Sequence, residues 1–129
     1  MKKEEFIQYW KDSSAEDLQR ANLLFRNKDY LFALFCCHLS LEKILKAHWV
    51  KDHSENFPPK IHNLVYLISN TKLNPPEPEL AFLEQMNLFQ LEGRYPDYKN
   101  KIAKIYDRNK CKLIMSKVNT LIKWLIKNL

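Results

Sequence analysis

Residues 30–50 read YLFALFCCHLSLEKILKAHWV and decide the fold of this chain. Their apolar side chains recur at the spacing of a helix, at Leu34, Cys37, Leu41, Leu45 and Trp49, with Phe35, Leu39 and Ile44 beside them. A helix that is apolar over most of its circumference packs against neighbours on several sides. The stretch therefore predicts a central helix, around which the rest of the chain is arranged.

A polar stripe runs along the same helix. His38, Glu42 and Lys46 follow one another at four-residue intervals, which places them on one side of a helix. Charged groups on a buried helix need partners, because an unpaired charge is costly to remove from water. The stripe is therefore either a satisfied structural network or the floor of a binding site.

Length and composition limit the fold class. With 129 residues, we expect one domain over residues 1–129. One glycine and six prolines argue against β-hairpins, whose tight turns need glycine, so we predict an all-α helical bundle. The sequence shows neither a signal peptide nor a membrane span, so we expect a cytoplasmic protein with no membrane contact. The three cysteines have neither zinc nor disulfide spacing, and we expect buried free thiols.

The net charge of +6 is concentrated near the end of the chain. Residues 99–129 carry nine lysines or arginines and one acid, whereas residues 1–98 carry twelve bases and fourteen acids. This asymmetry indicates a polyanion or an acidic protein as a partner. The alternative is a lysine-rich face that is simply solvated.

Five helices account for the apolar periodicity. They are expected over residues 3–27, 30–52, 61–71, 79–92 and 103–128. The first is read as one long helix that continues through Ser13 and Ser14, and Asp29 is expected to cap the second. Gly93 would end the fourth helix in a left-handed conformation. The last helix would bury Ile114, Val118, Leu121 and Leu125, with Lys104, Arg108 and Lys112 on its other side.

Three polar clusters are candidates for chemistry. They are His38, Glu42, Lys43 and Lys46 on the second helix, His62-Asn63 at the start of the third, and Arg94-Tyr95-Pro96-Asp97-Tyr98 before the last. Arginine offers a planar fork for phosphate, and tyrosine offers a face on which a base can stack. The structural alternative has Arg94 bonded to Glu42 and Tyr95 packed on the core. His62 would then cap the third helix.

Other catalytic and metal-binding chemistries find little support. We expect His48 and His53 on the surface near a helix end, and no pair of histidines has metal spacing. No glycine-rich phosphate loop and no nucleophile elbow is present. We therefore assign no catalytic residues, no metal site and no cofactor.

The motifs in these clusters resemble those of the HEPN domain family (higher eukaryotes and prokaryotes nucleotide-binding domain). The resemblance runs through Tyr9-Trp10, Ala15-Glu16-Asp17-Leu18, Tyr30, Ala33-Leu34-Phe35, His38, Leu41-Glu42-Lys43, Leu45-Lys46-Ala47, His62-Asn63-Leu64 and Arg94-Tyr95-Pro96-Asp97. It covers nearly the whole chain, although the family usually has His-Asp-Leu where this sequence has His62-Asn63-Leu64. The resemblance implies an antiparallel bundle of about five helices, similar to the substrate-binding subunits of nucleotidyltransferases.

Many HEPN proteins are metal-independent ribonucleases with an Arg-x4–6-His signature near the start of a late helix. This sequence lacks that signature, because no histidine lies beyond His62. The resemblance therefore points to a non-catalytic branch. It implies a homodimer and a minimal nucleotidyltransferase partner, as in toxin–antitoxin-like two-component systems.

Our hypothesis is a subunit that binds a nucleotide or RNA. Arg94 and Lys46 would contact phosphate, Tyr95 or Tyr98 would stack on a base, and His38, Glu42, Lys43 and His62 would line the pocket. The alternatives are a ribonuclease toxin that uses His38 or His62 as a relocated base, and a dimeric scaffold without a ligand.

Overall fold

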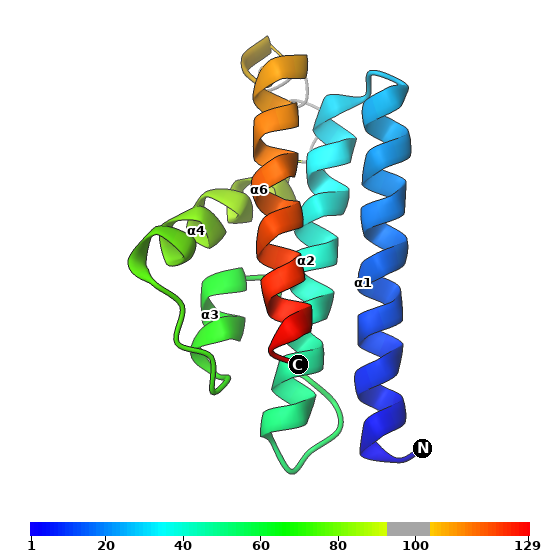
Figure 1. Ribbon diagram of the computed structural model, residues 1–129, viewed down its shortest axis with the longest axis vertical. Helices are drawn as coiled ribbons and strands as arrows, with labels where there is room; N and C mark the ends of the chain where they lie inside the picture. The colour runs from blue at the N-terminus through cyan, green and yellow to red at the C-terminus, as the bar shows by residue number, and fades with distance from the viewer. Residues whose placement is uncertain (93–103) are drawn as a thin grey trace.

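The structure is a computed structural model that describes residues 1–92 and 104–129. These residues form helices α1 (Lys3–Arg26), α2 (Tyr30–Asp52), α3 (Leu64–Ser69), α4 (Glu77–Glu92) and α6 (Arg108–Lys127), and contain no strand. Figure 1 shows α1, α2 and α6 side by side as three long rods, with α2 antiparallel to α1. The shorter α3 and α4 lie together on the side away from α1. The predicted all-α bundle is confirmed.

Helix α2 is the centre of the bundle. It contacts α1, α3, α4 and α6, and most of its side chains are buried. Ala33, Leu34, Leu41, Leu45 and Ala47 are fully removed from solvent. The apolar faces predicted for residues 30–50 are therefore all covered, because a different element packs against each face of the helix.

Helix α1 approaches α2 closely where both carry serine. The hydroxyl of Ser14 donates to the backbone oxygen of Ser40 over 2.7 Å, and the hydroxyl of Ser40 donates to the backbone oxygen of Ser14 over 2.8 Å. The short serine side chains allow the two helices to come close enough for these reciprocal hydrogen bonds. Ser14 thus joins the two helices and does not start a new one, so α1 is one continuous helix as predicted. Asp29 caps α2 by accepting from the N–H of Phe32.

Several predicted helix ends were wrong, and side-chain caps explain two of them. Helix α3 begins at Leu64 rather than residue 61, because Asn63 accepts from the N–H of Tyr66 over 3.0 Å. Asn63, and not His62, is therefore its cap. Helix α6 begins at Arg108, because Asp107 accepts from the N–H of Lys110 over 2.9 Å. Lys104 consequently lies outside α6.

Helix α4 begins two residues earlier than predicted, at Glu77. Pro78 lies in its first turn, where a backbone N–H has no partner within the helix, so proline is tolerated there. The predicted cap at Gly93 lies outside the described residues. The apolar stripe predicted for the last helix is confirmed, since Ile114, Val118, Leu121 and Leu125 are all buried.

The expectation that His48 lies on the surface was wrong. Its ring is fully buried, and Nε2–H donates to the backbone oxygen of Leu125 over 2.7 Å. That carbonyl belongs to the last turns of α6, where carbonyl groups run out of partners within the helix. His48 therefore fastens the end of α6 to α2.

This contact predicts a pH dependence of stability. Burial lowers the pKa of His48 below its ordinary value of 6.5. Below about pH 6.5 the unfolded chain binds a proton at His48, whereas the folded protein keeps the ring neutral. The contribution of His48 to the free energy of unfolding is therefore fully present above about pH 6.5 and falls as the pH drops below it. In urea denaturation between about pH 7.5 and pH 5, the free energy of unfolding should decrease less steeply with falling pH for His48→Gln than for the wild type. Equal slopes would contradict this assignment.

The three cysteines behave as expected from their apolar setting. Cys36, Cys37 and Cys111 are free and buried. Burial raises the pKa of Cys111 to about 12, so this thiol remains protonated. No described helix has the length and apolarity required to cross a membrane.

Candidate functional site

The polar stripe of α2 lies inside the protein and not on its surface. His38, Glu42 and Lys46 have relative exposures of 0%, 5% and 6%. Glu42 is the centre of this group, because both of its carboxylate oxygens accept hydrogen bonds. Oε2 accepts from the ammonium of Lys46 one turn later, over 2.9 Å, and Oε1 accepts from Nδ1 of His62 over 2.9 Å.

His62 is held at two points by α2. Besides the contact of its ring with Glu42, its backbone oxygen accepts from Nε2–H of His38 over 3.0 Å. Nδ1 of His38 lies 3.9 Å from Oε1 of Glu42. These contacts fix the segment before α3 against the central helix. The group His38, Glu42, Lys46 and His62 is called the Glu42 cluster below.

His62 is the member of the Glu42 cluster that reaches solvent. Its side chain is 40% exposed, compared with 6% for that of Glu42. A carboxylate only accepts hydrogen bonds, so Nδ1 of His62 carries the proton and Nε2 carries the lone pair of the neutral ring. The cluster therefore orients one histidine whose outer nitrogen accepts a hydrogen bond when neutral and donates one when protonated.

Trp10 extends the Glu42 cluster toward α1. The ammonium of Lys46 lies 5.4 Å from the centre of the Trp10 ring, within the range of a cation–π interaction. This places an aromatic face next to the buried ion pair. The Tyr9-Trp10 motif was noted in the sequence, but its position beside Lys46 depends on how α1 and α2 pack.

Lys43 points to a different partner. Its ammonium pairs with the carboxylate of Asp17 on α1, which also accepts from Arg20 over 2.8 Å. Asp17 is 3% exposed, so this is a second clamp between α1 and α2. Sequence reasoning missed Asp17 as a partner, although an acid on the face of α1 that carries Ala21 was a usable signal.

Asn87 is another residue that sequence reasoning did not single out. Its side-chain oxygen accepts from the N–H of Leu64 over 2.9 Å, and its amide donates to the side chain of Asn63 over 3.2 Å. It therefore fixes the start of α3 to α4. Because His62 directly precedes Asn63, this contact also helps to position the exposed ring.

The third predicted cluster, with Arg94, Tyr95 and Tyr98, lies outside the described residues. The pairing of Arg94 with Glu42 and the stacking roles of the two tyrosines remain predictions. Within residues 1–92 and 104–129, no group of three acidic, histidine or cysteine side chains is arranged to hold a metal ion.

Comparisons with known proteins agree with this architecture. The family model of the HEPN domain matches residues 7–129. The chain belongs to the HEPN domain family. The crystal structure of TT1696 from Thermus thermophilus superposes with a TM-score of 0.80, over 95% of this chain and 98% of that chain. At 18% sequence identity, this likeness supports the fold alone. The search of curated proteins gave no match.

Membership confirms the resemblance that the motifs indicated. It also associates the chain with functions related to nucleotides or RNA, and HEPN domains commonly dimerise. In this HEPN domain, the motif residues of α2 are divided between two clamps. Glu42 and Lys46 hold His62 and Trp10, whereas Lys43 holds Asp17.

Proposed function

We propose that this HEPN protein is a non-catalytic subunit that binds a nucleotide or RNA, with His62 as a contact residue. The observation that carries the proposal is the Glu42 cluster, in which three buried side chains orient one exposed ring. A ring held through Nδ1 and through its own backbone loses little freedom when a ligand binds at Nε2. Nε2 suits a ribose hydroxyl when neutral and a phosphate when protonated.

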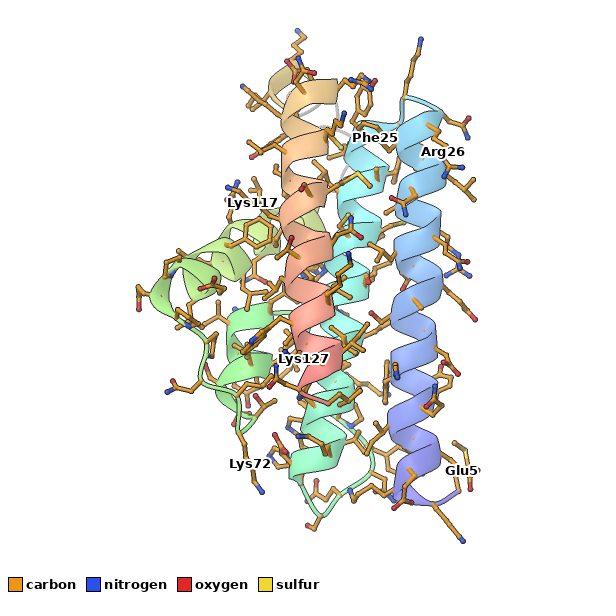
Figure 2. The ribbon with its side chains drawn as sticks, in the orientation of Figure 1. Glu5, Phe25, Arg26, Lys72, Lys117 and Lys127 are labelled. Atoms are coloured by element: carbon orange, nitrogen blue, oxygen red, sulfur yellow. The ribbon has the colours of Figure 1, made fainter. Side chains whose placement is uncertain are left out.

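The surface of α6 supports a polyanionic ligand. Its exposed basic side chains are Arg108, Lys110, Lys112, Lys117, Lys123 and Lys127. Figure 2 labels two of them, Lys117 and Lys127, at separate positions along the helix. Clustered positive charge raises the local concentration of phosphate-bearing ligands and makes their binding dependent on salt. We therefore expect binding to weaken as the salt concentration rises.

His62→Ala tests the proposed contact. Fluorescence anisotropy with labelled ATP and with a short labelled RNA should show affinity lower by about tenfold, as expected for the loss of one hydrogen bond to a charged group. His53→Ala is the matched control, because His53 also bonds internally, through Nδ1 to the backbone oxygen of Trp49. Equal affinities of wild type and His62→Ala for both ligands would reject His62 as a contact.

A second candidate, a ribonuclease, is favoured by one observation. A carboxylate that binds Nδ1–H of a histidine leaves Nε2 placed to act as a general base, as in catalytic triads. Only His62 suits this role within the Glu42 cluster, because the Nε2–H of His38 is already donated to a backbone carbonyl. RNA cleavage in EDTA by the wild type, abolished in His62→Ala, would establish the enzyme and refute the non-catalytic proposal.

The partner is part of the proposal. We infer a homodimer that works with a minimal nucleotidyltransferase in a toxin–antitoxin-like system. Two observations support this inference. The chain belongs to the HEPN family, and the positive charge of α6 is complementary to a negatively charged surface on a partner. Co-purification of such a partner encoded beside this chain would support this inference. Separate elution of the two proteins at low salt would contradict it.

A further inference from the structure

A hollow lies between α1 and α6, near the end of the bundle where α1 ends and α6 begins. It has a volume of about 230 Å³ and is lined by Asn22, Phe25, Lys112, Met115, Ser116 and Asn119. Figure 2 labels Phe25 near this end of the molecule and Lys72 at the opposite end. The volume is below the range of roughly 300–1,000 Å³ that is typical of sites for whole small molecules. The hollow therefore suits one unit of a longer ligand that continues over the surface.

The hollow combines an aromatic ring with a hydrogen-bond acceptor and cations. The guanidinium of Arg108 lies 5.6 Å from the centre of the partly buried Phe25 ring, within the range of a cation–π interaction. The same ring packs against Tyr30, with ring centres 5.6 Å apart, so it is held from two sides. The side-chain amide of Asn119 donates to the backbone oxygen of Met115 over 2.8 Å, which leaves its own oxygen as an acceptor.

The positive charge at this hollow is not balanced within α6. From Arg108 to Lys127 this helix has six exposed basic residues and no acid. Neither Arg108 nor Lys112 forms an ion pair with any other described residue. Helix stability does not explain these cations, because positive charge in the first turn of a helix opposes its macrodipole. A surface that is merely solvated mixes both signs of charge, so the cations favour an anionic ligand.

We propose that the hollow between α1 and α6 binds one nucleotide of a single-stranded RNA. The base would lie against Phe25, and the adjoining phosphates would contact Arg108 and Lys112. Bases of single-stranded RNA stack on aromatic or arginine side chains, while the backbone follows basic residues. An acidic protein surface would match the cations but would bring no base to the aromatic ring.

This inference rests on the proposed function and narrows its ligand to an RNA strand. The hollow shares no residue with the Glu42 cluster. Tyr30, which packs against Phe25, begins α2, and Glu42 lies about 18 Å further along that helix at a rise of 1.5 Å per residue. A strand of several nucleotides can reach both places, so we expect affinity to rise with the length of the RNA.

The test of the base contact uses fluorescence anisotropy with a labelled RNA of twelve adenosines and with an abasic strand of the same length. Phe25→Leu should reduce the affinity for the RNA by at least about fivefold, as expected for the loss of one stacked base, and should leave the affinity for the abasic strand unchanged. Phe57→Leu is the matched control, because Phe57 is 75% exposed and lies outside the hollow. Equal affinities of Phe25→Leu and wild type for the RNA would overturn the proposal.

The phosphate contacts are tested at exposed positions, so these variants leave the core intact. In Arg108→Gln and in Lys112→Gln, the slope of log affinity against log salt concentration should fall in magnitude by about 0.7, the value for one contact to a single strand. Lys72→Gln removes the same charge at an exposed position outside the hollow and should leave the slope unchanged. Equal slopes in Arg108→Gln, Lys112→Gln and Lys72→Gln would contradict the phosphate contacts.

The results separate this inference from the function on which it rests. If His62→Ala weakens RNA binding while Phe25→Leu, Arg108→Gln and Lys112→Gln bind as the wild type does, RNA is held at His62 alone and the hollow is not a site. If the wild type at about 0.1 mM binds neither ATP nor the RNA, the inference and the proposed function are both wrong.

Discussion

Replacing Glu42 with alanine is expected to lower the free energy of unfolding by about 3–5 kcal/mol, the range for breaking a buried ion pair. Lys46 is 6% exposed, and its ammonium has Glu42 as its carboxylate partner at 2.9 Å. Without Glu42 it remains buried as an uncompensated charge. Nδ1–H of His62 loses its acceptor in the same variant. Urea denaturation at neutral pH measures the loss.

A double variant separates the ion pair from simple side-chain removal. Changing Glu42 and Lys46 together to leucine removes both charges, and apolar replacement of a whole buried pair is often neutral or stabilising. Glu42→Leu/Lys46→Leu should therefore be more stable than Glu42→Ala. If the double variant is as unstable as Glu42→Ala, packing at this position matters more than charge.

The second large effect is expected for Phe89→Ala, which should lower the free energy of unfolding by about 3–5 kcal/mol. Phe89 is fully buried on α4 and meets the ring of Tyr106 edge to face, with ring centres 5.0 Å apart. Its truncation leaves a cavity where α4 joins the core. Thermal and urea denaturation should both report the change.

Phe57→Ala is the matched control for this variant. Phe57 is 75% exposed, although its ring touches Phe6 with centres 5.2 Å apart. The same chemical change there should cost less than about 0.5 kcal/mol, because surface substitutions remove little buried area. Similar losses at residues 57 and 89 would contradict the position of α4 in the fold.

Much of the fold was readable because local rules and tertiary packing agree. The apolar circumference of residues 30–50 predicted the central helix, and the stripe from Ile114 to Leu125 predicted the buried face of α6. Caps were harder to read. Asn63 and Asp107 determine where α3 and α6 begin, and several polar residues near each start were equally suitable caps.

The candidate site was predictable only in part. The four-residue spacing placed His38, Glu42 and Lys46 together, and the motif added His62, which the structure brings into contact with Glu42. Lys43 was grouped with them because it is adjacent in sequence, yet it pairs with Asp17 on another face of α2. Adjacent helical residues point in different directions, so proximity in the sequence does not place Lys43 on the face of Glu42.

The sequence by itself determined the all-α class, the central helix and HEPN family membership, because these depend on periodicity and short motifs within single elements. Tertiary structure alone decided which side chains are buried and which reach solvent. The spacing of the stripe on α2 left open a structural network and the floor of a binding site. Packing of α1 and of the segment before α3 covers His38, Glu42 and Lys46 and leaves His62 accessible. The burial of a residue depends on which other elements pack against it, so it cannot be predicted from the local sequence pattern.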